Sequence, residues 1–111
     1  MFQNLKVVEL ASVLAGPSVG QFFAELGAQV IKVENLQTGG DVTRTWKSIG
    51  EQTDDRSAYF CSCNWGKKSI AIDLKTGQGK TIVRKLEPVQ ILSSPVTNPG
   101  MPKNWVFLTN N

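Results

Sequence analysis

Short apolar runs and one stretch of helical spacing alternate along the first third of the chain. Val7, Val8 and Leu10 form a short apolar run typical of a strand. Val30, Ile31 and Val33 form a second one, and Lys32 is the only charge within it. Between them, apolar positions recur three and four residues apart, which predicts a helix with an apolar face made of Val19, Phe22, Phe23 and Leu26. This order predicts two parallel strands joined by a right-handed crossover.

Glycine and proline mark the ends of the predicted helix. Pro17, which follows Gly16, suits the first turn of a helix, where its missing N–H costs nothing, and Gly27 suits the position after the last turn. Ligands of parallel sheets bind outside the carboxyl ends of the strands. We therefore expect a functional site at the loop 11–17.

A long polar connection follows the second strand. Residues 35–55 are polar and contain glycines, which predicts an extended segment, with Trp46 packing back onto the sheet. Residues 57–63 predict a short helix whose N-cap is Asp55 or Ser57.

The last predicted elements are a strand, a helix and a further strand. Residues 68–74 alternate and are rich in isoleucine, as in a strand, and Val89–Leu92 is the candidate for a fourth strand. Between them, a helix capped by Thr76 is expected to run to about Leu86, with an apolar face made of Ile82, Val83 and Leu86. The predicted fold class is α/β, with a partial Rossmann-like parallel sheet.

Composition excludes several classes of site. A chain of 111 residues with 41% hydrophobic residues and a net charge of +3 fits one globular domain without a nucleic-acid-binding tail. Histidine is absent, so this chain cannot build a Ser-His-Asp triad. Cys61 and Cys63 are expected to be free thiols, because a bridge across so short a loop would be strained and zinc needs more ligands. We expect no metal site.

Neither a signal peptide nor a membrane span is expected. The first ten residues lack a basic region followed by a long apolar run, and no apolar stretch approaches the roughly 20 residues that cross a bilayer. The expected location is cytoplasmic.

Four phrases of the chain resemble the family III CoA-transferases. They lie in the family's order and spacing at residues 13–17 (VLAGP), 25–34 (ELGAQVIKVE), 40–44 (GDVTR) and 64–75 (NWGKKSIAIDLK). The resemblance extends over residues 5 to about 86. On these four motifs together the chain is identified as a member of that family.

The resemblance implies chemistry on coenzyme A. Similar full-length proteins form interlocked homodimers and move CoA from an acyl-CoA to a small carboxylic acid, with a catalytic aspartate as nucleophile. Some relatives instead racemise or isomerise an acyl-CoA. CoA is then a substrate, and no permanently bound cofactor is expected. The key carboxylate of these proteins lies well C-terminal to the matched region, so we nominate no catalytic residue and expect no turnover by this chain alone.

The resemblance also implies positions for the CoA-binding residues. Leu14 and Ala15 match a loop near the CoA thioester, where backbone N–H groups could stabilise an anionic oxygen. A second segment matches the lining of the adenine nucleotide, with Lys75 as a phosphate partner; it consists of Ile72, Asp73, Leu74 and Lys75. For Ile72 and Leu74, simple burial in the core is an equal alternative.

Several positions depart from the family pattern. Asn35 stands where such proteins commonly carry an arginine that reaches a CoA phosphate, and Leu14 stands where some carry a glutamine. Trp65 replaces a residue that is often basic or polar. Lys67 and Lys68 either supply compensating positive charge or lie on a solvated face.

Residues 88–111 do not match the family, which places the end of the partial CoA-transferase domain (1–87) at residue 87. Reading the possible codons of residues 98–107 one base earlier allows KPGDAEKLGF, close to a family phrase. We therefore expect a shifted reading frame after about Glu87 and no evolved packing partner for the tail. DNA sequencing across codons 85–90 that finds an intact frame would refute this.

Two other interpretations stay open. One is a dinucleotide-binding half-domain, since Glu34 ends the second strand, where Rossmann proteins place a ribose-binding acid. Against it, Gly16 and Gly20 are four residues apart and do not form the G-x-G-x-x-G pattern. The other is a non-catalytic fragment that folds partially or only with another chain.

Overall fold

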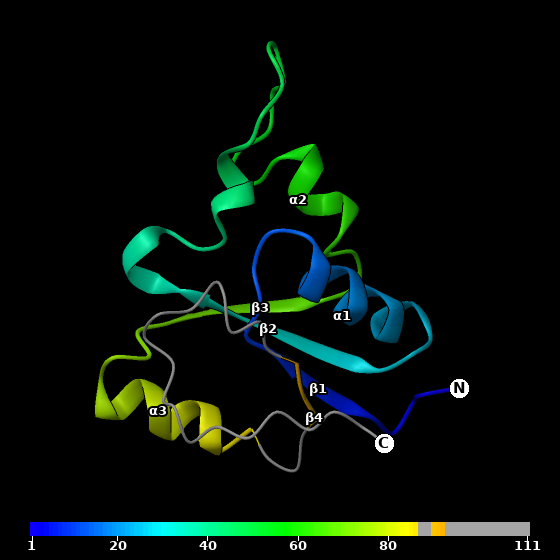
Figure 1. The fold of residues 1–111 in the computed structure, drawn as a ribbon, viewed down its shortest axis with the longest axis vertical. Helices are drawn as coiled ribbons and strands as arrows, with labels where there is room; N and C mark the ends of the chain where they lie inside the picture. The colour runs from blue at the N-terminus through cyan, green and yellow to red at the C-terminus, as the bar shows by residue number, and fades with distance from the viewer. Residues whose placement is uncertain (87–89, 93–111) are drawn as a thin grey trace.

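The strands form one parallel sheet that is covered by helices (Figure 1). The computed structural model describes residues 1–86 and 90–92. The sheet has the order β3-β2-β1-β4 and consists of β1 (Lys6–Glu9), β2 (Gln29–Asn35), β3 (Lys68–Ile72) and β4 (Gln90–Leu92). Every neighbouring pair is parallel. The predicted α/β class with a parallel sheet is thus confirmed.

Helices occupy the connections between the strands. The described α-helices are α1 (Ala15–Glu25), α2 (Ala58–Ser62) and α3 (Gly77–Arg84). Two 3-10 helices follow β2, namely η1 (Leu36–Thr38) and η2 (Val42–Thr45), so the prediction of an extended connection over 35–55 is wrong in its first half. Asn35 and Asp41 start these turns, because each side chain accepts a hydrogen bond from the backbone two residues later.

The predicted starts of α2 and α3 and the predicted end of α1 are confirmed, whereas α3 ends at Arg84, slightly before the predicted Leu86. The hydroxyl of Ser57 accepts from the Phe60 N–H at 2.9 Å, and that of Thr76 accepts from the Gly79 N–H at 3.0 Å. Gly27 follows α1 with a φ of +98°, a conformation that favours glycine.

The prediction for Trp46 is wrong. Its ring packs edge-on against Tyr59 near α2, with ring centroids 5.2 Å apart, and 46% of its surface is exposed. The segment between η2 and α2 projects away from the sheet (Figure 1), so Trp46 at its base meets α2 and not a strand.

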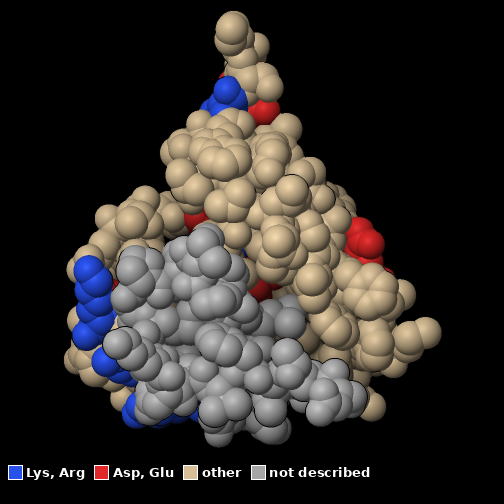
Figure 2. All heavy atoms as spheres, in the orientation of Figure 1, with Lys and Arg blue, Asp and Glu red and all other residues tan. Residues whose placement is uncertain are grey.

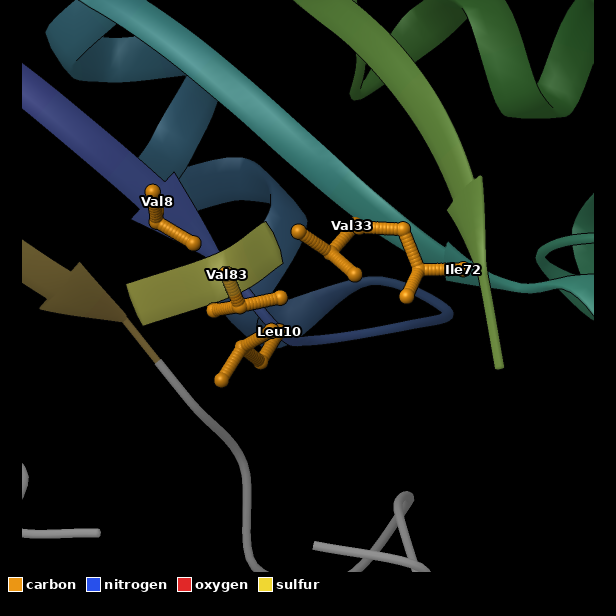
Figure 3. Close-up of a cluster of buried hydrophobic side chains, with 5 residues drawn as sticks. All are labelled: Val8, Leu10, Val33, Ile72 and Val83. Carbon is orange, nitrogen blue, oxygen red and sulfur yellow. The ribbon is translucent and has the colours of Figure 1, made fainter. Parts of the chain in front are cut away.

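The two faces of the sheet carry separate apolar clusters. Side chains from β1, β2 and β3 meet Val83 of α3 on one face (Figure 3), in a buried cluster made of Val8, Leu10, Val33, Ile72 and Val83. Val7 and Val30 belong to a second cluster, against which Phe23 and Ala24 of α1 pack. Because neighbouring residues of a strand point to opposite faces, α1 and α3 cover opposite sides of the sheet.

The buried face of α1 is only partly the predicted one, since Phe23 packs against the second cluster but two other predicted residues are exposed. Val19 and Phe22 are 46% and 55% exposed, whereas Pro17 and Gly20 are buried. A methyl group at Gly20 would overlap the carboxylate of Glu9, so the helix meets β1 through its small residues. Helix α1 therefore buries its small residues over the Glu9 carboxylate, while Phe23 and Ala24 pack against the apolar cluster of Val7 and Val30.

The apolar face of α3 is also only partly as predicted. Val83 is buried and Leu86 packs against the same cluster, but Ile82 is 44% exposed. The two cysteines, Cys61 and Cys63, are free thiols as predicted.

Strand β4 lies where the fourth strand was predicted and pairs with β1. The rest of the 88–111 segment lies outside the described residues, so the domain boundary at 87 and the shifted frame stay predictions. In the part of the chain that the structure describes, no helix is long and apolar enough to cross a bilayer. The cytoplasmic location also stays a prediction.

Candidate functional site

A cleft of about 630 Å³ opens at the carboxyl ends of β1, β2 and β3. Its walls are the loop after β1, the end of β2 with the turns that follow, and the segment after β3. The lining residues are Ala11–Val13, Lys32–Asn35, Gln37–Val42, Thr45 and Ile72–Lys75. The ends of parallel strands are where the topology of such sheets places a ligand.

The structure brings together one of the two predicted groups of binding residues. Ile72, Asp73, Leu74 and Lys75 all line the cleft. Leu14 and Ala15 do not line it; both are exposed at the start of α1, directly after the cleft residue Val13. The prediction of the second segment therefore coincides with the cleft, and that of the first falls at its edge.

The segment after β3 combines core and cleft positions. Ile72 is only 4% exposed and belongs to the buried cluster with Val83, and Leu74 packs against that cluster. The carboxylate of Asp73 accepts from the Gln37 side chain at 2.9 Å and from the Lys75 N–H at 3.0 Å. These bonds tie the end of β3 to η1 and leave the exposed Lys75 side chain as the cation of this segment.

Positive charge gathers along α3 and its flanks, and one of these basic residues, Lys75, lines the cleft. Figure 2 shows Lys and Arg side chains along the edge of the molecule where Figure 1 places α3. The basic residues of α3 and its flanks are Lys75, Lys80, Arg84 and Lys85, and residues 74–86 contain no acidic residue. Such an edge attracts an anionic ligand.

The structure shows what two of the residues that depart from the family pattern do. The Asn35 side chain caps η1 by accepting from the Gln37 N–H at 2.9 Å, so it has a local role even though it lines the cleft. Trp65 is 73% exposed and its backbone N–H donates to the Gln21 side chain of α1. Neither residue supplies a charge in place of the arginine.

Glu34 is buried and fully engaged by its neighbours. Arg44 donates to both of its oxygens, at 2.7 and 2.6 Å, and Ser69 and the Asp41 N–H donate as well. Burial raises the pKa of Glu34, but these hydrogen bonds outweigh it and lower the pKa from 4.5 to about 2. Glu34 therefore buttresses the turns after β2 and is not free to bind a ribose.

Lys67 is not the solvated residue that one interpretation expected. Its side chain is 2% exposed, and its ammonium donates to Glu9 at 2.6 Å and to backbone oxygens of Pro17 and Cys63. Burial lowers the pKa of Lys67, although Glu9 opposes that shift. Lys67 thus joins β1, α1 and α2 beneath the helix, while Lys68 is exposed.

The sequence interpretation missed the buried polar floor of the cleft. Lys32 and Asp41 line the cleft and form an ion pair of 3.0 Å, and Lys32 also pairs with Glu9 at 3.0 Å. The available signal was a lysine inside an otherwise apolar strand, since such a residue is buried only when it is paired. Among the described residues, no group of histidine, cysteine or acidic side chains could hold a metal ion.

These features define an open parallel α/β protein with a cleft at the carboxyl ends of its strands. A family model described as CoA-transferase family III matches residues 2–89. The chain is 49% identical over 87 residues to succinate–glutarate CoA-transferase of Agrobacterium fabrum, which covers 75% of this chain and 22% of that protein. It is 41% identical to human succinyl-CoA:glutarate CoA-transferase over 87 residues, 78% of this chain and 19% of the human protein.

A solved structure from this family also matches the chain. The crystal structure of a CAIB/BAIF family protein from Brucella suis superposes with a TM-score of 0.73 at 45% identity, covering 82% of this chain and 25% of that one. The chain belongs to CoA-transferase family III. It spans about a fifth of the length of the curated relatives named above.

Proposed function

We propose that this chain forms part of the CoA-binding surface of an enzyme that moves CoA between an acyl-CoA and a carboxylic acid. The observation that carries the proposal is the cleft at the strand ends, because segments from all four family motifs line it or lie at its edge. The two curated relatives named above are CoA-transferases by name, which supports the same chemistry.

In this proposal, the adenine nucleotide part of CoA lies against the segment 72–75. Ile72 and Leu74 give that wall an apolar component, and the Lys75 ammonium at the basic edge neutralises phosphate charge. Leu14 and Ala15 follow Val13 directly, so a CoA chain that extends past Val13 reaches the start of α1. There, backbone N–H groups can stabilise an anionic oxygen of the thioester.

The proposed role is binding and not the chemical step. The family's catalytic aspartate lies beyond the matched region, so the acyl acceptor and the homodimer belong to the longer relatives in this proposal. Acyl-CoA transfer by the purified chain, above a buffer control and proportional to its concentration, would contradict this part of the proposal.

The geometry counts against a dinucleotide site. A Rossmann dinucleotide site needs a strand-end acid that can bind the ribose. Here that acid, Glu34, already accepts hydrogen bonds from Arg44, Ser69 and the Asp41 N–H. No observation on the described residues favours an acyl-CoA racemase or isomerase over a CoA-transferase.

The contribution of Lys75 tests the proposal directly. Lys75→Gln should weaken CoA binding about fivefold in a calorimetric titration, because an exposed charge pair contributes about 1 kcal/mol. Lys6→Gln is the matched control, since Lys6 is also exposed but begins β1 at the opposite end of the sheet. Equal CoA affinity of the two variants would show that the CoA phosphates do not contact Lys75.

A further inference from the structure

Four buried charged side chains form a row of ion pairs beneath the loop that follows β1. Lys67 pairs with Glu9 at 2.6 Å, Glu9 with Lys32 at 3.0 Å, and Lys32 with Asp41 at 3.0 Å. Each of these side chains is at most 2% exposed. Two positive and two negative charges compensate one another, which is the condition under which buried charges are tolerated.

Asp41, at one end of this row of ion pairs, holds the backbone of the cleft wall together with Lys32. The Asp41 carboxylate accepts from the Val13 N–H at 3.2 Å, and Lys32 donates to the carbonyl oxygen of Ala11 at 2.8 Å. The carbonyl oxygen of Val13 accepts from the Cys63 thiol at 3.4 Å. Both ends of the segment Ala11–Val13, which lines the cleft, are therefore fixed by buried groups.

The backbone at Val13 requires such support. Val13 has a φ of +71°, the only positive φ of a non-glycine residue among the described residues. A β-branched residue in this region is strained and keeps the conformation only where its surroundings impose it. The bond to Asp41 is the contact that satisfies the Val13 N–H in this conformation.

We propose that Asp41 is a positioning residue, whose buried carboxylate holds Val13 in its left-handed conformation and so shapes the wall of the cleft that receives CoA. This inference rests on the proposed function. Asparagine cannot replace the aspartate. Thr43 donates its N–H and hydroxyl to Oδ1, while Val13 and Lys32 donate to Oδ2. An amide would turn its NH₂ group toward one of these pairs of donors.

Amide hydrogen exchange of the full chain, followed by NMR, tests the contact without a ligand. We expect the Val13 amide to be protected in the wild type and to exchange at least tenfold faster in Asp41→Asn, while the β2 amides keep their protection. Val30→Ala is the control, because it weakens the buried cluster at the amino end of β2. A Val13 amide that is unprotected in the wild type, or unaffected by Asp41→Asn, contradicts the proposal.

Calorimetric titration with CoA tests the consequence for binding. Asp41→Asn should weaken CoA binding at least tenfold, and Val30→Ala should leave it unchanged. The double variant Asp41→Asn with Val13→Gly should recover part of the loss, because glycine adopts a positive φ without strain. If Asp41→Asn weakened binding only because a buried charge is lost, Val13→Gly would not restore affinity. Absence of recovery in the double variant therefore contradicts the positioning role. Unchanged affinity of Asp41→Asn contradicts it as well.

The two measurements separate this inference from the proposed function. A wild-type chain that does not bind CoA refutes the proposed function, while the exchange of the Val13 amide still decides whether Asp41 holds the loop. Should Asp41→Asn fail to fold, the wild-type chain decides: a protected Val13 amide supports the contact, and exchange at the rate of an unstructured peptide overturns it.

Discussion

The carboxylate of Glu34 lies at the end of β2, under the turn that carries Arg44. It is 5% exposed, and donors from η2, β3 and the backbone engage both of its oxygens. A carboxylate in this position is stabilised in its charged form, because the hydrogen bonds outweigh the cost of burial. At the scale of single residues, the folded structure therefore stabilises the charged form of Glu34 beside the cleft.

The pKa of Glu34 predicts how stability depends on pH. The folded-state pKa of about 2 lies below the ordinary value of 4.5, so the folded state binds fewer protons between these two pH values. The stabilisation is present above about pH 4.5 and is lost as the pH falls toward about 2. It amounts to roughly 3 kcal/mol.

Urea unfolding at pH 7 and pH 3 measures this effect. Glu34→Gln should lower the free energy of unfolding at pH 7 and should lose less of it than the wild type on acidification, because glutamine does not titrate. An identical loss in both proteins would show that other carboxylates cause the acid sensitivity.

At the scale of elements, the packing of α1 on β1 depends on glycine. Gly20→Ala should lower the free energy of unfolding by about 1–3 kcal/mol, because the added methyl group would overlap a carboxylate that two lysines hold in place. Gly77→Ala at the start of α3 is the matched control, since nothing lies within 4 Å of its added Cβ. It should be stabilising by about 0.5 kcal/mol. Equal stability of the two variants in urea unfolding would contradict this packing.

The same helix shows what the hydrophobic pattern could and could not predict. The strands were predictable, since each of the first three predicted strands contributes buried β-branched side chains to one sheet, namely Val7, Val8, Val30, Val33 and Ile72. The buried face of α1 was predictable only in part, because Phe23 of the apolar stripe packs against the second cluster while Val19 and Phe22 stay exposed. Helix periodicity identifies a helix, but a polar side chain beneath it can select the face with the smallest residues.

At the scale of the whole molecule, the cleft is assembled from residues far apart in the chain. Its segment 72–75 was predictable from the family motifs, whereas the buried pairs were not. Glu9 and Lys67 are 58 positions apart, and Val13 and Asp41 are 28 apart. No local pattern reveals which charges will meet once the strands align. The position of the cleft follows from the topology, and its floor is defined only by the folded chain.

The measurement that tests this account most directly is a titration of the purified chain with CoA and, separately, with NAD, followed by calorimetry and by thermal unfolding. The account predicts one cooperative unfolding transition, saturable binding of CoA with a rise in the transition temperature, and no response to NAD. Saturable binding of NAD, or a folded chain that does not respond to CoA, would contradict it.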